Sequence, residues 1–185
     1  MGLIRLTKDQ TEKIQIDEGI VVVDLGETSE KVLGPTRGGA EFTATPTIRD
    51  IEYDGRKGKT KGLQVKDGED VLLKVASLDC SQEVLKLAIP NSKLEQTTKE
   101  IKQGEFGLIK EDNYLKNVAI ITKTLDGKFK ILTLKNPMHE GAFGFKATSK
   151  AENEHNLEFI GHYDYTNPDD PIWSVKDADT NPIVG

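Results

Sequence analysis

Cysteine is almost absent from this chain. The one cysteine, Cys80, cannot form an intrachain disulfide and cannot build a cysteine-based zinc site. It lies in an apolar pattern of helical spacing, where a free cysteine usually behaves as a small buried hydrophobe rather than a nucleophile. We therefore expect a chain that folds without disulfides, which fits a cytosolic birthplace.

Long apolar runs are absent too. No stretch approaches the roughly 18 apolar residues of a membrane span. The first ten residues, MGLIRLTKDQ, lack the apolar core of a signal peptide, and Leu6 stands where N-myristoylation requires Ser or Thr. We expect no membrane partner, and the length of 185 residues suits a single domain over 1–185.

Motifs for catalysis and nucleotide binding are missing as well. The chain has no Gly-x-Ser-x-Gly sequence. The glycine-rich run at residues 34–39 lacks the Gly-Lys-Ser/Thr ending of a phosphate loop and precedes an expected strand rather than a helix. No pair of carboxylates stands out for acid–base work. We expect no enzyme activity, no catalytic residue and no cofactor.

A metal site is the main chemical alternative. His162 and Asp164 would share one face of a strand, and His155 lies nearby in sequence. Two histidines and a carboxylate can bind a transition metal, as in a metal hydrolase. However, His155 falls in a polar stretch where we expect it to face water. We therefore favour a strand beside a loop, with no metal ligands.

Charge is unevenly distributed. The formal net charge is −6, which argues against a protein that grips nucleic-acid phosphates. Residues 152–185 carry eight carboxylates and one lysine. A compact basic cluster consists of Arg56, Lys57, Lys59 and Lys61. Complementary patches of this kind can steer self-association, although solvated loops give the same pattern.

Strand patterns dominate the chain. The clearest hairpin joins Val118–Leu125 to Lys128–Leu134 through the two-residue turn Asp126-Gly127. Further sequence patterns predict a first hairpin of 13–16 with 20–25, a strand at 71–78, and strands around 142–148 and 157–165. The sum is a mainly β domain that must close as a sandwich or barrel to protect its edges.

One helix is expected between Asp79 and Pro90. Asp79 is a candidate N-cap, with Gln82 three residues later as in a capping box. Val84 and Leu87 follow at helical spacing, and Pro90 ends the pattern. About ten residues make a marginal helix alone, so we expect it to pack against a sheet. Residues 91–116 are polar and give no clear pattern.

The segment from Gly34 to Gly62 is the most distinctive part of the chain. It holds six of the 17 glycines and ten charged residues, on either side of an extended run at 42–53. Pro46 cannot donate to a sheet ladder, which favours an edge strand. The apolar alternation changes phase near Arg49-Asp50, which predicts a bulge or bend there. Asp54-Gly55 predicts a turn.

Three segments resemble the major tail proteins, or tail tube proteins, of long-tailed, siphovirus-like bacteriophages. The first is Gly34–Gly62, with Gly38-Gly39 before the extended run and Ile51-Glu52-Tyr53-Asp54-Gly55 at its end. The second is the strand and helix at 71–90. The third is the ending LEFIGHYDYTNPDDPIWSV at 157–175. Together they cover about half of the chain in matching order.

The resemblance implies a β-sandwich or closed β-layer with one flanking α-helix, a long extended loop and a C-terminal arm. It implies a structural virion protein that self-assembles into hexameric rings, which stack into a hollow tail tube for DNA passage without specific binding. The implied partners are further copies, the tail tip or initiator, the tape measure and the tail terminator. The implied locations are the virion tail and, during assembly, the host cytoplasm.

By position, the resemblance makes residues 34–62 an inter-subunit loop and residues 166–185 a C-terminal arm. The loop's glycines would let it order only on assembly. Deleting 36–61 is accordingly expected to leave a folded domain that forms no tubes. The side chains expected at contacts between subunits are Arg37, Arg49, Asp50, Tyr53, Arg56, Lys57, Lys59, Lys61 and Trp173.

There are two alternative hypotheses to the flexible tail tube. One is a non-catalytic β-sandwich binding module, for example for carbohydrate. Its aromatic content of 6% and single tryptophan make it the weaker reading, because such surfaces use exposed aromatic side chains. The other is the tube protein of a contractile tail or a tail-like particle, which the sequence does not separate from the first.

Overall fold

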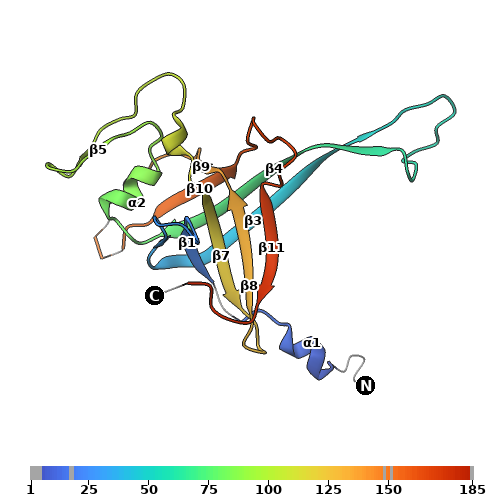
Figure 1. Cartoon of the computed structure of the whole chain (residues 1–185), viewed down its shortest axis with the longest axis horizontal. Helices are drawn as coiled ribbons and strands as arrows, with labels where there is room; N and C mark the ends of the chain where they lie inside the picture. The colour runs from blue at the N-terminus through green and yellow to red at the C-terminus, as the bar shows by residue number, and fades with distance from the viewer. Residues whose placement is uncertain (1–5, 17–18, 148, 151, 184–185) are drawn as a thin grey trace.

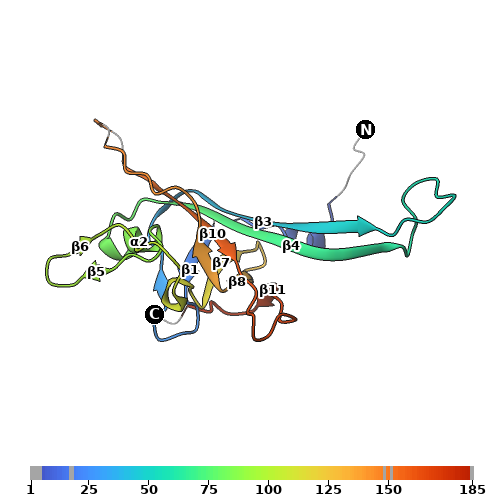
Figure 2. The same ribbon diagram turned by 90° about the horizontal axis from the view of Figure 1, so that it is seen from above.

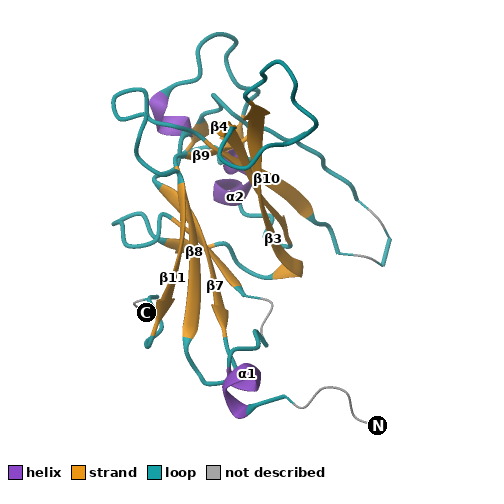
Figure 3. Cartoon of the chain, turned by 90° about the vertical axis from the view of Figure 1, so that its right-hand side faces the viewer, coloured by secondary structure: helices purple, strands orange, loops and turns teal. Residues whose placement is uncertain are grey.

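Two antiparallel sheets face each other across the core (Figures 1 and 3). The computed structural model describes residues 6–16, 19–147, 149–150 and 152–183. The five-stranded sheet has the order β11-β8-β7-β1-β2, formed by Trp173–Ala178, Phe129–Lys135, Asn117–Lys123, Ile20–Val23 and Lys31–Val32. The four-stranded sheet has the order β3-β4-β10-β9, formed by Thr36–Asp50, Gln64–Ser77, His155–Gly161 and Pro137–His139. The expected mainly β sandwich is confirmed.

The core lies between the sheets. Strands β7 and β1 supply Val118 and Val21, while β4 and β10 supply Leu73 and Phe159, all buried in one cluster. The second face of the five-stranded sheet is apolar as well. There Val22, Ala119, Ile121 and Ile131 form a smaller cluster, against which Leu25, Phe129, Ala178 and Ile183 pack. This explains why β1 is a continuous run of β-branched residues rather than an alternating one.

The helical elements are short. They are α1 (Lys8–Glu12), α2 (Gln82–Leu87) and the 3-10 turn η1 (Glu111–Asn113). Val84 of α2 is buried in the main core, so α2 is the expected flanking helix. The single-helix expectation missed α1, which begins with a capping box between Thr7 and Gln10. No helix in the described part of the chain has the length and apolar character needed to cross a membrane.

The predicted cap and length of α2 are wrong. Ser81, not Asp79, is the N-cap, and its hydroxyl accepts a hydrogen bond from the Val84 N–H at 3.5 Å. The Asp79 carboxylate instead accepts a hydrogen bond from the Ser81 N–H at 2.8 Å, in the turn that precedes the helix. Cys80 consequently precedes the helix, and it is exposed rather than buried.

Two predicted strands are not formed. Residues 13–16 do not pair with 20–25, because β1 pairs with β2 and β7 instead, and the expected turn at 17–18 lies outside the described residues. Residues 142–147 have no regular structure, and residue 148 lies outside the described part. The nearest strand is β9, which ends at His139. The hairpin of β7 and β8 is confirmed to within two residues at each end.

Candidate assembly surface

The hairpin of β3 and β4 projects beyond the rest of the molecule as an arm, with residues 51–63 at its tip (Figures 1 and 2). Strand β10 pairs with β4 only from Leu72 to Ser77. The eight residues Gln64–Val71 therefore pair with β3 alone, which at about 3.3 Å per residue gives an arm of roughly 26 Å. Most of the predicted loop at 34–62 is thus a strand.

Strand β3 is an edge strand, as Pro46 predicted. The register shifts between Thr47 and Ile48, two residues before the predicted phase change at Arg49-Asp50. A second irregularity lies between Arg37 and Ala40, where Gly38 and Gly39 both have positive φ. The chain needs glycine there because the left-handed region strains other residues. The turn at Asp54-Gly55 is confirmed, with Gly55 at φ +85°.

Trp173 fixes the base of the arm. Its indole N–H donates to the Glu69 carboxylate on β4 at 2.7 Å, and its ring lies 5.5 Å from that of Phe42 on β3. Lys66 and then Trp173, both hydrogen-bonded to Glu69, hold the pKa of that carboxyl below its usual value. Trp173 therefore joins the two sheets within one chain, at the point where the arm leaves the body.

Polar side chains pair along the arm. The Arg49 guanidinium contacts the Asp67 carboxylate at 2.7 Å, and Asp67 raises the pKa of Arg49. Gln64 donates to Asp50 at 2.8 Å, and Arg56 lies 3.5 Å from the other oxygen of Asp50. These contacts stabilise the pairing of β3 with β4 near the tip of the arm, where no hydrophobic core supports the two strands.

The tip carries unpaired cations beside exposed apolar side chains. Lys57, Lys59 and Lys61 are exposed and form no ion pair within the described residues. The large exposed apolar side chains of the outer arm are those of Ile48, Ile51 and Tyr53. Seven of the nine residues expected at subunit contacts meet on this outer arm: Arg49, Asp50, Tyr53, Arg56, Lys57, Lys59 and Lys61.

Arg37 and Trp173 lie apart from these seven residues. Arg37 is at the opposite end of β3, where it contacts Glu152 at 2.7 Å and Glu154 at 3.7 Å. The pKa of Glu152 is lowered by a backbone hydrogen bond and by Arg37. Trp173 belongs to β11, which pairs with β8 of the same chain as far as Ala178. Within the expected C-terminal arm at 166–185, the residues Trp173–Ala178 thus form a strand of the body.

The outer strands of the four-stranded sheet are β3 and β9. β9 is only three residues long; the Glu140 N–H still donates to the Glu158 carbonyl of β10 at 3.1 Å, and residues 142–147 then continue without regular strand pairing. Alternate side chains of β4 point away from the core, among them Lys74, which forms an ion pair with Glu158 of β10 at 2.8 Å. The outer face of this sheet therefore carries charged side chains beside Leu72 and Ile160, and β3 is its long open edge. At β9, Pro137 has no N–H, and its carbonyl accepts a hydrogen bond from the Leu115 N–H at 3.0 Å.

The structure does not bring the histidines together with Asp164. His155 is buried, contrary to the expectation that it faces water, because β10 begins there and pairs it with Ser77. His162 lies 2.9 Å from the Glu140 carboxylate, while Asp164 accepts hydrogen bonds from Thr166. No group of three or more potential metal ligands is found among the described residues.

A second exposed site, which sequence analysis missed, lies in the segment at 91–113. This segment holds the short hairpin of β5 (Leu94–Glu95) and β6 (Glu100–Ile101), and it leaves Phe106 and Leu108 almost fully exposed. The Phe-Gly-Leu sequence flanked by charged residues was the only available signal. Only the structure shows that no other part of the described chain covers Phe106 and Leu108.

Comparisons with known proteins give similarity in structure alone. No family model and no curated protein matches the chain. The fold is similar to a chain in the tail of an empty gene transfer agent particle, refined with C6 symmetry, at a TM-score of 0.47 and 10% identity over 78% of this chain and 91% of that one. It is also similar to a chain in the virion of a native gene transfer agent particle, at a TM-score of 0.47 and 10% identity over 80% of this chain and 95% of that one.

Proposed function

We propose that this chain is the tail tube protein of a phage-like particle, a structural protein that assembles into stacked hexameric rings. The observation that carries the proposal is the four-stranded sheet, whose long outer strand β3 is an open edge and whose other outer strand, β9, is only three residues long. An unpaired edge exposes a row of backbone donors and acceptors, which a soluble protein must cover or pair. Joining β3 of one copy to the β9 side of the next removes both edges.

The proposed contact accounts for the strand that a single chain does not form. The sequence of residues 142–147 predicts a strand, but in the described part of the chain this segment has no partner strand. They continue from the β9 edge, where β3 of a neighbouring copy would supply the missing partner. Such a contact joins two different surfaces, and contacts of this type close into rings.

The outer face of the four-stranded sheet would then line the channel. Glu41, Asp70 and Glu158 lie on that face with two cations, Lys74 and Arg37, as the alternation along β3, β4 and β10 requires. A surplus of carboxylates repels phosphate groups, so DNA would pass without binding. The initiator, the tape measure and the terminator would contact the ends and the lumen of this tube.

Negative-stain electron microscopy of the purified chain at high concentration tests the proposal. We expect rings or hollow tubes. A variant in which an Asn-Gly turn replaces residues 51–63 is the matched control, because Asp50 and Gln64 are directly paired and a two-residue turn fits between them. It should stay folded and lose only contacts made by the tip.

From the sequence, deletion of residues 36–61 was expected to leave a folded domain. The structure makes this deletion unsuitable as a control. It would remove Phe42 and Ala44, which pack against the main core. The proposal fails if the native chain sediments as a monomer at every concentration, with and without initiator proteins. It also fails if discrete dimers form and neither rings nor tubes appear.

A further inference from the structure

Phe106 and Leu108 form an apolar projection on the segment at 91–113, and they are 94% and 91% exposed. Gly107, with φ +125°, separates them. A single exposed apolar residue needs no explanation, but two large ones beside each other on one short loop are costly to leave in water. The loop is also held in place, as the next contacts show.

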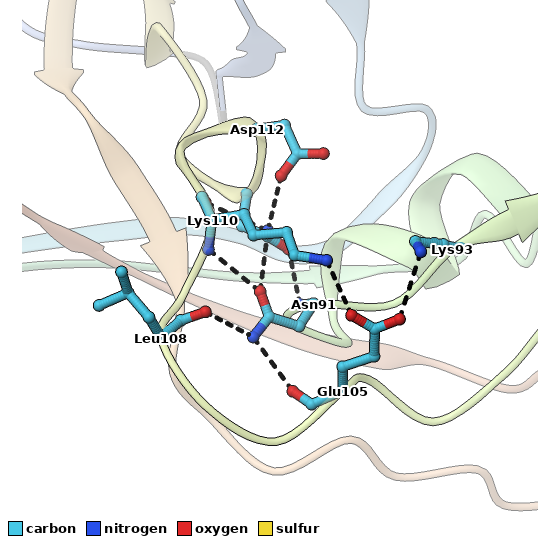
Figure 4. Close-up of polar contacts among 7 residues, drawn as sticks. Asn91, Lys93, Glu105, Leu108, Lys110 and Asp112 are labelled. Atoms are coloured by element: carbon cyan, nitrogen blue, oxygen red, sulfur yellow. Dashed lines mark hydrogen bonds and ion pairs between the residues drawn. The ribbon is translucent and has the colours of Figure 1, made fainter.

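Asn91 anchors this loop from beneath (Figure 4). Its buried side-chain amide donates to the backbone carbonyls of Glu105 and Leu108 at 3.1 and 3.2 Å. Its carbonyl oxygen accepts from the Lys110 backbone N–H at 3.1 Å and from the Asn113 side chain at 3.2 Å. One side chain thus fixes the backbone on both sides of the projection.

Two further features restrain the loop. The Glu105 carboxylate contacts Lys110 at 2.8 Å and Lys93 at 3.2 Å, and these hydrogen bonds lower its pKa, Lys110 more than Lys93. Gly104 lies so close to Pro90 that a Cβ there would overlap the Pro90 carbonyl oxygen. The projection is therefore preorganised, which reduces the conformational entropy lost when a partner binds.

The charges left over around the projection are mainly negative. Glu95, Glu111 and Asp112 form no ion pair within the described part of the chain, against one lysine, Lys99, while Lys93, Lys102 and Lys110 are each paired with a carboxylate. A partner should therefore offer an apolar patch next to free cations. The outer arm of this same chain has that composition.

We propose that the projection of Phe106 and Leu108 binds the outer arm of a second copy. The arm presents exposed Ile48, Ile51 and Tyr53 beside the unpaired Lys57, Lys59 and Lys61. The segment that carries the projection, which includes β5 and β6, lies on the opposite side of the body from the arm tip in Figures 1 and 2, so the two surfaces cannot meet within one chain. The contact joins two different surfaces and can propagate from copy to copy.

This contact adds to the proposed tail-tube function and rests on it for its biological setting. It assigns a receiving surface to the arm and a role to residues 91–113. It is separate from the sheet-edge contact, because it uses side chains of the outer arm and of residues 91–113 rather than the backbone groups along the edges of β3 and β9. The two contacts can therefore fail independently.

The first test removes the apolar groups. The variant Phe106→Ser/Leu108→Ser should melt as the native chain does, since both side chains lie in solvent. The concentration needed for half-maximal assembly, followed by light scattering, should rise roughly tenfold or more, the scale of a lost anchor contact. Tyr165→Ser is the matched control, because Tyr165 is also a large exposed side chain, at 85%.

The second test identifies the partner surface. In a Cys80→Ser background, which removes the one exposed thiol, a tagged Phe106→Cys chain is mixed with an untagged Tyr53→Cys chain under mild oxidation. We expect a disulfide-linked heterodimer in several-fold higher yield than with an untagged Tyr165→Cys chain. Equal yields from the two mixtures overturn the inference.

The outcomes separate this inference from the proposed function. Rings or tubes that form equally well with Phe106→Ser/Leu108→Ser overturn the inference and leave the tail-tube proposal standing. A selective Phe106–Tyr53 cross-link without rings or tubes supports the inference and contradicts the tail tube. Cross-links of Phe106 to neither position show that another protein, or none, covers the projection, and they also overturn the inference.

Discussion

The indole N–H of Trp173 donates to the Glu69 carboxylate at 2.7 Å and joins two strands that are 104 residues apart in the chain. Trp173 begins β11 of the five-stranded sheet, and Glu69 lies on β4 where the arm leaves the four-stranded sheet. The bond therefore fixes the direction of the arm relative to the body. An arm that is already oriented would lose less entropy on contact with a second copy than a mobile loop would.

The first prediction concerns this bond. Trp173→Phe keeps an aromatic ring beside Phe42 and removes the donor. Amide hydrogen exchange in Gln64–Glu69 should become roughly tenfold faster, while exchange in β7 stays unchanged, because the lost bond restrains the arm and not the core. Glu69→Gln keeps an acceptor for the indole and should show a smaller effect. Unchanged exchange in both variants would show that strand pairing alone holds the arm.

The second prediction concerns Asn91, which has φ +56° and is buried. Asn91→Gly removes its side-chain hydrogen bonds while relieving any backbone strain, so a loss of stability reports the bonds. We expect the free energy of unfolding to fall by about 2 kcal/mol, since backbone groups of Glu105, Leu108 and Lys110 lose their partner. Urea denaturation measures this.

Lys99→Gly is the matched control for Asn91→Gly. Lys99 also has φ +56° but is exposed, so glycine there should be neutral or slightly stabilising. If both glycine variants behave alike, the Asn91 hydrogen bonds contribute little, and the loop at 105–110 must be held by its ion pairs.

The third prediction concerns pH. Burial lowers the pKa of His139 below 6.5, and its Nδ1 accepts a hydrogen bond from the Glu158 N–H at 2.9 Å. Between the folded pKa and 6.5 the unfolded chain binds more protons than the folded chain, so the free energy of unfolding falls as pH falls. Melting temperatures at pH 7, 6 and 5 should therefore decrease.

His139→Gln tests the source of this decrease, because it should flatten the profile between pH 7 and 5. The carboxyls with lowered pKa, such as Glu69 and Glu105, lose their stabilising charge only at lower pH, below their ordinary value of 4.5. A profile of the same steepness in His139→Gln would assign the effect to other groups.

The fourth prediction concerns the tip. Reversing Lys57, Lys59 and Lys61 to glutamate should leave the melting temperature within about 1 °C, because none forms an ion pair in the described chain and exposed substitutions change little. The rate of assembly at low salt should fall and lose its salt dependence, because the steering attraction is gone. Stopped-flow light scattering at several salt concentrations measures this. Charge reversal at Lys123, which is exposed at the end of β7, is the control.

Local signals were sufficient where neighbours in sequence are also neighbours in space. The turn Asp126-Gly127 predicted the hairpin of β7 and β8, since a two-residue turn sets the pairing register of both strands. Pro46 predicted an edge strand because it lacks a donor. The cap of α2 was misassigned because Asp79 and Ser81 are both good N-caps, and the choice between them depends on how β4 ends.

Partners distant in sequence decided what local signals could not. The segment at 13–16 reads as a strand, but β7 and β2 occupy both sides of β1, so no hairpin forms there. His155 looks like a surface residue in a polar stretch, yet pairing with Ser77 buries it. Residues 142–147 have strand character, but they form no strand pairing among the described residues and contact the body through the rings of Phe143 and Phe145 against His155.

The sequence by itself determined the mainly β class, the edge position of the 34–62 segment and the basic character of its tip, because these follow from turn residues, Pro46 and clustered lysines. Only the tertiary structure decided that this segment is a paired arm, that Trp173 fixes its base and that Asn91 holds Phe106 and Leu108 in solvent. These features depend on contacts between residues far apart in the chain, and such contacts cannot be inferred from periodicity and composition.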